Sequence, residues 1–380
     1  MNFDYSDEQT SLKREARRFL EARCPAAAVH ELSNGGDRSY DRTLWTGIAE
    51  LGWLGAAIPE SYGGSGIGYI ELCAVAEELG RVLAPVPVAS TLYFFVEALL
   101  RGGSPAQRSH WLPRAAAGGV IGCLATSEGP GGIGARPLAA SVEGGRLTGV
   151  KIPVTDGDVA DAAIVLAAEA GGPGLYIVEL EQPTVKRERL ASLDATRGIA
   201  RLSFSAAPAE RLGAPGEGRR LLEEVNYRAA VLLAFEQLGG ADRCLEAARD
   251  YALQRYAFGR QVGANQAIKH RLADMYVKNE LARSTAYYAA WALNTNATEL
   301  PAAAAAARLA ASDAFNFASR ENIQIHGGMG FTREADAHLY FRRARQLSLV
   351  AGSLASWGES LVCALSRRFP RMEHSTAAEV

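Results

Sequence analysis

Two segments of this chain combine arginine, glutamine and glycine in patterns that suit a phosphate-bearing ligand. The first, residues 251–274, holds Arg255, Phe258 and Gln266 around Gly259. The pattern predicts that one helix ends near Arg255 and that a second begins near Gln266. Guanidinium groups match phosphate oxygens bidentately, so an arginine at this junction suits a phosphate partner. The alternative is an ordinary helical hairpin in which Phe258 plugs the core.

The second segment is rich in glycine. Residues 323–334 read IQIHGGMGFTRE, with Gln324 followed by Gly327 and Gly328, and they come directly after a predicted long helix. Glycine lets the backbone approach a ligand or a neighbouring subunit closely. Taken alone, the segment is explained equally by a glycine-rich cap at the end of a helix.

A third glycine-rich stretch is a misleading match. Residues 129–134, GPGGIG, satisfy the G-x-G-x-x-G pattern and follow an apolar strand-like run. The residues after them, 135–137, do not open a helix. Without a helix N-terminus there is no row of free N–H groups to hold a pyrophosphate, which argues against a dinucleotide-binding βαβ unit.

Composition excludes several classes of protein. The 380 residues are 48% hydrophobic, and 40 Lys+Arg against 42 Asp+Glu give a net charge of -2. No basic stripe suggests nucleic acid, and no apolar run reaches the roughly 18–20 residues that span a bilayer. The acidic, polar N-terminus is unlike a signal peptide, so the expected location is the cytoplasm. The five cysteines and six histidines show no metal-ligand spacing, so no metal site is expected.

The periodicity of apolar residues divides the chain into three predicted domains. Residues 1–118 read as helical, starting with a capping box at Ser6 and Gln9. Residues 119–217 hold short apolar runs between Gly- and Pro-rich turns, which predicts strands. Residues 218–380 predict a bundle of long helices. The predicted strands are 120–125, 147–154, 162–166, 174–180 and 199–204, and the predicted long helices are 219–254, 264–293, 300–324 and 336–370.

The RxxFG…Q block and the QIHGGMGF block, in this order and separation, resemble the signature of the acyl-CoA dehydrogenase family. The resemblance covers nearly the whole chain. It implies a mainly α fold with a central β-domain, that is, an N-terminal helical domain, a small β-barrel or sandwich, and a C-terminal four-helix bundle. It also implies a homotetramer or homodimer, or a heterotetramer with a related dehydrogenase subunit, in which FAD lies across a subunit interface.

The resemblance assigns residues to the cofactor. Arg255 and Phe258 would reach the pyrophosphate and adenine of the neighbouring subunit's FAD. The same half of that FAD would be lined by Gln266, Gln324, Gly327 and Gly328. For the chain's own flavin, the corresponding residues are Ser127 and Thr155, but Pro153 stands where the family has an aromatic residue that shields the flavin ring.

The implied reaction is α,β-dehydrogenation of an acyl-CoA thioester. A carboxylate removes the α-proton while the β-hydrogen leaves as hydride to the flavin, and electron-transfer flavoprotein is the expected acceptor. The family commonly places the base glutamate where this chain has Ala351, which cannot accept a proton. Loss of a positioned base typically costs about 10²–10⁴ in rate.

Glu236 is the candidate for a relocated base. It lies in an otherwise apolar stretch, and a buried carboxylate can be suited to proton abstraction. A structural glutamate paired with an arginine of an adjacent helix is the competing interpretation. The chain is therefore expected to be either an active homo-oligomer that uses Glu236 or the FAD-completing subunit of a heteromer. A flavin-dependent oxidase or monooxygenase of the same fold and a non-catalytic structural subunit are the alternatives.

Overall fold

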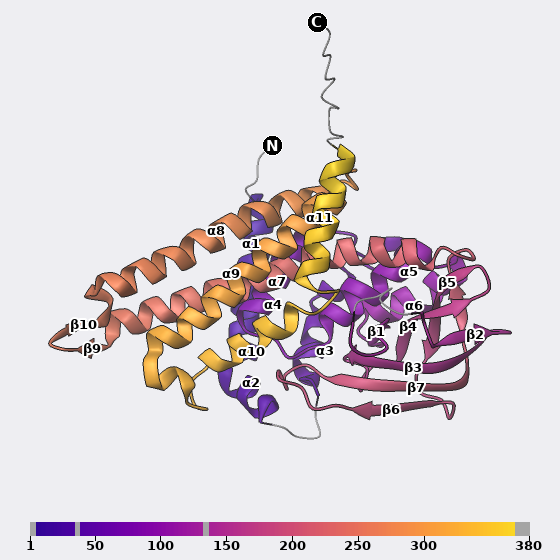
Figure 1. Cartoon of the computed structure of the whole chain (residues 1–380), viewed down its shortest axis with the longest axis horizontal. Coiled ribbons are helices and arrows are strands. Elements are labelled where there is room, and N and C mark those ends of the chain that lie inside the picture. The colour runs from indigo at the N-terminus through magenta and orange to yellow at the C-terminus, as the bar shows by residue number, and fades with distance from the viewer. Residues whose placement is uncertain (1–4, 35–38, 132–136, 369–380) are drawn as a thin grey trace, which may run out of the picture.

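Helices from both ends of the chain pack together beside a β-sheet that its middle third forms. The computed structural model describes residues 5–34, 39–131 and 137–368. The long helices α7, α8 and α9 run side by side along the longest axis of the molecule, and the sheet lies at one end of that axis (Figure 1). The expected mainly α fold with a central β-domain and C-terminal helices is confirmed.

The N-terminal region is helical up to Ala116. The expected capping box is present, because the Ser6 side chain accepts from the Gln9 N–H at 3.2 Å and Gln9 accepts from the Ser6 N–H at 2.9 Å. The elements of this region are α1 (Asp7–Arg23), α2 (Ala26–Ser33), α3 (Arg42–Glu50), η1 (Trp53–Gly55), η2 (Glu60–Tyr62), α4 (Tyr69–Arg81), the π-helix η3 (Ala89–Val96), α5 (Glu97–Gly102) and α6 (Pro105–Ala116).

The middle region forms one mixed sheet of eight strands. Its order is β6-β7-β3-β2-β4-β5-β8, with β1 pairing in parallel with β4. Each predicted strand is present, and β2, β6 and β8 were not predicted. The strands are β1 (Gly122–Ala125), β2 (Ser141–Glu143), β3 (Arg146–Thr155), β4 (Ala162–Glu169), β5 (Gly172–Glu179), β6 (Val185–Arg189), β7 (Ile199–Pro208) and β8 (Glu210–Leu212).

The C-terminal region supplies the long helices. They are α7 (Gly218–Gln254), α8 (Gln266–Asn294), α9 (Leu300–His326), α10 (Ala337–Leu347) and α11 (Leu354–Arg368), with the short elements β9 (Tyr256–Ala257), β10 (Arg260–Gln261), η4 (Val262–Ala264) and η5 (Gly327–Phe331). The prediction of one helical segment over 336–370 was wrong. Ala351 and Gly352 have φ values of 63° and 110°, and this left-handed backbone separates α10 from α11.

Close packing of α4 on α7 fixes the middle of α7. A Cβ added to Gly80 would lie 1.8 Å from the carbonyl oxygen of Glu236, and one added to Gly239 would lie 1.7 Å from that of Glu77. Both positions therefore require glycine. This contact sets where the α7 side chains around Glu236 point, and the stretch around it is buried on all sides.

Candidate functional site

The segment after α7 forms a tight hairpin with an exposed tip. Strands β9 and β10 pair antiparallel, with Phe258 and Gly259 as the two-residue loop. Their φ values of 53° and 78° are those of a type I′ turn, which favours glycine or asparagine and is strained for phenylalanine. The Phe258 side chain is 104% exposed. The interpretation of Phe258 as a core plug was wrong.

The polar side chains beside this tip are available to a ligand. Arg255 and Gln266 are exposed, and within the described residues neither side chain has a hydrogen-bond or ion-pair partner. Arg260, by contrast, donates to Asn265 Oδ1 at 2.5 Å. As expected, α7 ends directly before Arg255 and α8 begins at Gln266. The guanidinium of Arg255 is thus presented to solvent at a helix junction.

The glycine-rich segment caps α9 and leaves its backbone open. Gly327 adopts a φ of 59° and its N–H donates to the Gln324 carbonyl, so the cap interpretation holds. The Gln324 side chain is exposed, and a Cβ added to Gly327 or Gly328 would meet nothing within 4 Å. The backbone at these two glycines is therefore accessible to a ligand as well as capping the helix.

The structure brings the two segments to the same end of the helical bundle (Figure 1). Tyr251 of α7 and His326 of α9 stack with ring centroids 4.2 Å apart. Figure 1 also places the β9–β10 hairpin and the sheet at opposite ends of the long axis.

Of the two residues expected beside the chain's own flavin, Thr155 lies in β3 and Ser127 lies after β1, hydrogen-bonded to β3. The Ile152 N–H donates to the Ser127 carbonyl at 2.8 Å, and Thr155 ends β3 opposite Ile199. Ser127 Oγ donates to the Gly129 carbonyl at 3.2 Å. Pro153, where the sequence comparison expects an aromatic residue, is exposed. Backbone and hydroxyl groups here can hydrogen-bond a flavin edge.

The glycine pattern at residues 129–134 gains no support as a dinucleotide site. Residues 132–134 lie outside the described part of the chain. From residue 137 onward the backbone has no helix and leads into β2.

Glu236 is buried and ion-paired. Its side chain is 4% exposed, Arg197 Nη2 lies 3.0 Å from its Oε1, and Arg343 Nη1 lies 3.5 Å from the same atom. Arg343 comes from the adjacent helix α10, as the structural interpretation expected. Two guanidinium groups thus contact the same oxygen of this buried carboxylate.

The buried groups around Glu236 come from all three regions of the chain. Arg197 also donates to the Val86 carbonyl at 2.9 Å, and Arg343 Nε donates to Asp194 at 2.5 Å. Burial opposes ionisation of Asp194, but Arg343 and Thr196 lower the pKa of its carboxyl below the ordinary value. Burial raises the pKa of Asp156 despite the nearby Arg197. The cluster links the N-terminal helices, the sheet and the bundle.

The turn at Ala351 is held by a buried arginine. Arg308 Nη2 donates to the carbonyl of Val350 at 2.9 Å and to that of Leu347, and Nη1 donates to Gln237 at 2.5 Å. Burial lowers the pKa of Arg308 to about 10. Sequence analysis missed Arg308, although a single cation within the alanine-rich run 302–311 is a signal of burial with a specific partner.

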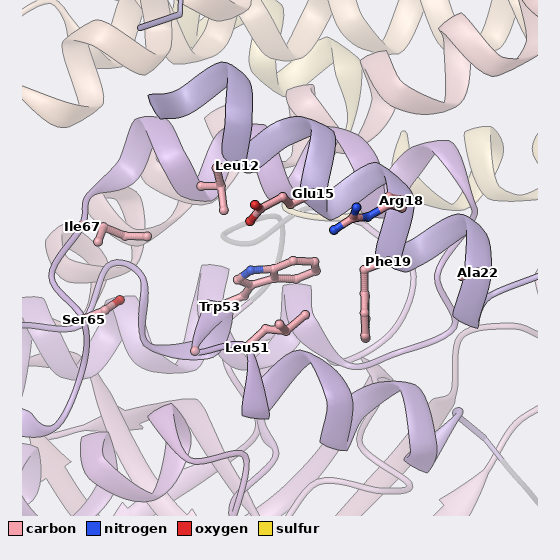
Figure 2. Close-up of a pocket in the computed structure, with 10 residues that line it drawn as sticks. Leu12, Glu15, Arg18, Phe19, Ala22, Leu51, Trp53, Ser65 and Ile67 are labelled. Atoms are coloured by element: carbon pink, nitrogen blue, oxygen red, sulfur yellow. The ribbon is translucent and has the colours of Figure 1, made fainter. Parts of the chain in front are cut away.

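Two pockets lie in the described part of the chain, one in the N-terminal region and one beside the end of α9. One, of about 650 Å³, is an open apolar hollow in the N-terminal region with Glu15 and Arg18 at its rim (Figure 2). Figure 2 shows Trp53 between Leu12 of α1 and Leu51, with the Phe19 ring beside it. The other, of about 220 Å³, adjoins His326 and is lined by Arg243, Ala247, Asn322, Glu334, Ala335, Asp336, Ala337 and Tyr340.

Metal ligands and membrane spans were also sought. In the described ranges, no three His, Cys, Asp or Glu side chains are grouped so that they could hold a metal ion. None of the helices described is long and apolar enough to cross a bilayer.

Comparison with known proteins matches both helical regions to one family. Residues 6–119 match the acyl-CoA dehydrogenase N-terminal domain, and residues 216–356 match the acyl-CoA dehydrogenase C-terminal domain. Acyl-CoA dehydrogenase IpdE2 of Mycobacterium tuberculosis is 36% identical over 338 residues, which are 89% of this chain and 91% of that protein.

Solved structures are also similar to this chain. The ChsE4–ChsE5 complex from Mycobacterium tuberculosis has a chain that is 29% identical with a TM-score of 0.87, and the match covers 96% of this chain and 99% of that one. Butyryl-CoA dehydrogenase from Megasphaera elsdenii is 26% identical with a TM-score of 0.88, covering 96% of this chain and 100% of that one.

Proposed function

This chain belongs to the acyl-CoA dehydrogenase family, and we propose that within it the chain is the FAD-completing subunit of a heteromeric dehydrogenase. The family consists of FAD-dependent oxidoreductases that act on CH–CH donors, and FAD is the cofactor. In the proposed assembly, a related second chain holds the flavin ring and carries the base. This chain contributes contacts to the far half of that FAD from Arg255, Phe258, Gln266, Gln324, Gly327 and Gly328.

The state of Glu236 carries the proposal. A base must reach the α-carbon of the substrate, but this carboxylate is buried between Arg197 and Arg343. Ala351 offers no carboxylate at the usual position. Removing either charge partner of a buried pair is strongly unfavourable, so the role we assign to Glu236 is structural.

The exposed ends of α7 and α9 support the other half of the proposal. Arg255 and Gln266 have no side-chain partner among the residues that the structure describes, and the backbone at Gly327 and Gly328 is open. Both features fit an anionic pyrophosphate supplied from outside the chain. A heteromeric relative gives a precedent, because the ChsE4–ChsE5 complex has this fold. Ser127 and Thr155 would serve a flavin of this chain's own, which the proposed assembly lacks.

The chemistry then belongs to the shared site. The partner's carboxylate would take the α-proton of the acyl-CoA, and loss of the β-hydrogen would leave a C=C bond in the product. Bound FAD supplies the two-electron acceptor, and we propose electron-transfer flavoprotein as the next acceptor. The residues of this chain bind and orient the pyrophosphate and adenine.

The test is to purify the tagged chain from its own host and to measure its mass by native mass spectrometry. We expect two copies of this chain with two copies of a second dehydrogenase chain and two FAD molecules. Anaerobic bleaching of the flavin is then followed with acyl-CoA esters of short, medium and long chains and with a steroid side-chain ester.

Glu236→Gln is the decisive variant. A structural Glu236 predicts that the substitution lowers the thermal midpoint but leaves the bleaching rate of the folded complex nearly unchanged, whereas a base would lose about 10²–10⁴ in rate. A yellow homo-oligomer with four FAD per tetramer, whose bleaching stops in Glu236→Gln, would overturn the proposal. Bleaching by no acyl-CoA but turnover with another donor would instead favour an oxidase or monooxygenase.

A further inference from the structure

One ring contact joins the two segments that face the shared cofactor. Tyr251 lies four residues before Arg255, and His326 lies directly before Gly327. Their rings stack at 4.2 Å between centroids with an interplanar angle of 28°. A contact between two ligand-bearing segments can fix their separation, which neither segment determines alone.

The imidazole is oriented by its own helix. His326 Nδ1 lies 2.9 Å from the carbonyl oxygen of Asn322, and a carbonyl can only accept, so Nδ1 carries a hydrogen and donates it. The ring therefore has a set orientation before Tyr251 packs on it. Both rings are half-buried, which shields the contact on part of its surface.

The hairpin is hydrogen-bonded to the Tyr251 end of α7. The Val262 N–H donates to the Arg255 carbonyl at 2.8 Å, and Gln261 Nε2 donates to the Leu253 carbonyl at 2.7 Å. These bonds tie the returning strand to the last turn of the helix. A displacement of Tyr251 would therefore carry the guanidinium of Arg255 and the ring of Phe258 with it.

The glycine-rich turn is tied in the same way to His326. A Cβ added to Gly330 would lie 2.6 Å from the Ile323 carbonyl, so the turn folds closely back on the end of α9. The open backbone at Gly327 and Gly328 begins at the very next residue after the histidine. Each ligand segment is thus a small rigid unit that ends on one of the two stacked rings.

We propose that the Tyr251–His326 stack is a positioning clasp that sets the distance between Arg255 and the Gly327–Gly328 backbone for one pyrophosphate. Tyr251 and His326 act through these neighbours and do not themselves contact the cofactor. This inference rests on the proposed function. It names two residues of the FAD site that the sequence motifs leave without a role.

The test compares ring-removing and ring-keeping variants in the intact complex. Tyr251→Ala and His326→Ala remove the stack, whereas Tyr251→Phe and His326→Phe keep an aromatic ring. FAD retention is measured as the apparent Kd from flavin fluorescence on dilution, and native mass spectrometry checks assembly. We expect the alanine variants to weaken FAD binding by about three- to tenfold and the phenylalanine variants to stay near the wild type.

The double variant makes the inference sharper. If the two rings act as one clasp, Tyr251→Ala with His326→Ala loses no more FAD affinity than either single change. Additive losses, or wild-type affinity in both alanine variants, would overturn the clasp.

Arg255→Ala separates the two levels of the argument. If it weakens FAD retention while the ring variants do not, the clasp alone is wrong. If Arg255→Ala also leaves retention unchanged, the chain does not complete the FAD site, and both proposals fall.

Discussion

The charged side chains around Glu236, in the middle of α7, are buried. At the end of α7 that leads into the β9–β10 hairpin, charged side chains are exposed. Arg197 and Arg343 each engage carboxylates and backbone carbonyls in the interior. Arg255 stands exposed without a side-chain partner in the described part of the chain. The backbone differs as well, because the hairpin tip holds a phenylalanine at positive φ.

This difference separates a structural role from a binding role along one helix. The buried cluster around Glu236 is ion-paired and links three regions of the chain, which is a structural role. Three features here have no folding benefit of their own: Arg255, which has no side-chain partner among the described residues, the open glycine backbone, and the strained, exposed Phe258. They are explained when a second molecule completes them. The comparison predicts that changes at the first place alter stability and that changes at the second alter FAD binding.

The largest expected effect is on stability, from Arg343→Met. It leaves Asp194 buried without its guanidinium and takes one cation from Glu236, a change that costs about 3–5 kcal/mol in the free energy of unfolding. Urea unfolding followed by circular dichroism measures the loss. Arg342→Met on the half-buried neighbouring position is the control, with a small effect expected. Equal losses of unfolding free energy in Arg343→Met and Arg342→Met would contradict the structural role of the cluster around Glu236.

The next effect is on the cofactor, from Arg255→Ala. A charge-assisted hydrogen bond to phosphate contributes about 1.5–3 kcal/mol, so FAD affinity of the complex should fall by roughly 10- to 100-fold. The urea midpoint should not change, because the side chain is exposed. Arg249→Ala is the matched control, since Arg249 is also exposed on α7 but pairs with Asp250 at 2.7 Å. An Arg255→Ala complex that is less stable but retains FAD would give Arg255 a structural role and contradict its role in binding.

Much of this contrast could be predicted from the sequence. The features that could not be predicted have a common cause. The junction at Arg255, the start of α8 at Gln266 and the capping box at Ser6 depend on residues within a few positions of each other. Local periodicity and capping residues encode such features. The same holds for the long helices and for most of the strands.

The missed features depend on residues far apart in the sequence. The break between α10 and α11 is stabilised by Arg308, about 40 residues earlier. Its guanidinium donates hydrogen bonds to the carbonyls of Leu347 and Val350. The burial of Glu236 follows from its apolar neighbours in the sequence, but its partners do not: Arg197 comes from the segment between β6 and β7, and Arg343 comes from α10. The Tyr251–His326 stack likewise joins two helix ends that no motif connects.

The smallest expected effect on stability separates the two roles within one residue, Phe258. Asparagine tolerates the left-handed backbone of a type I′ turn, so Phe258→Asn should relieve strain and raise the free energy of unfolding by about 0.5–1 kcal/mol. The same change removes an aromatic ring that can stack on adenine, and stacking contributes about 1–3 kcal/mol per base. We therefore expect a slightly more stable chain that holds FAD more weakly. Leu253→Asn is the control, because it removes an exposed apolar side chain from ordinary helical backbone and should give no gain in stability. A Phe258→Asn complex that is more stable and retains FAD as tightly as the wild type would show that the strained tip serves something other than the cofactor.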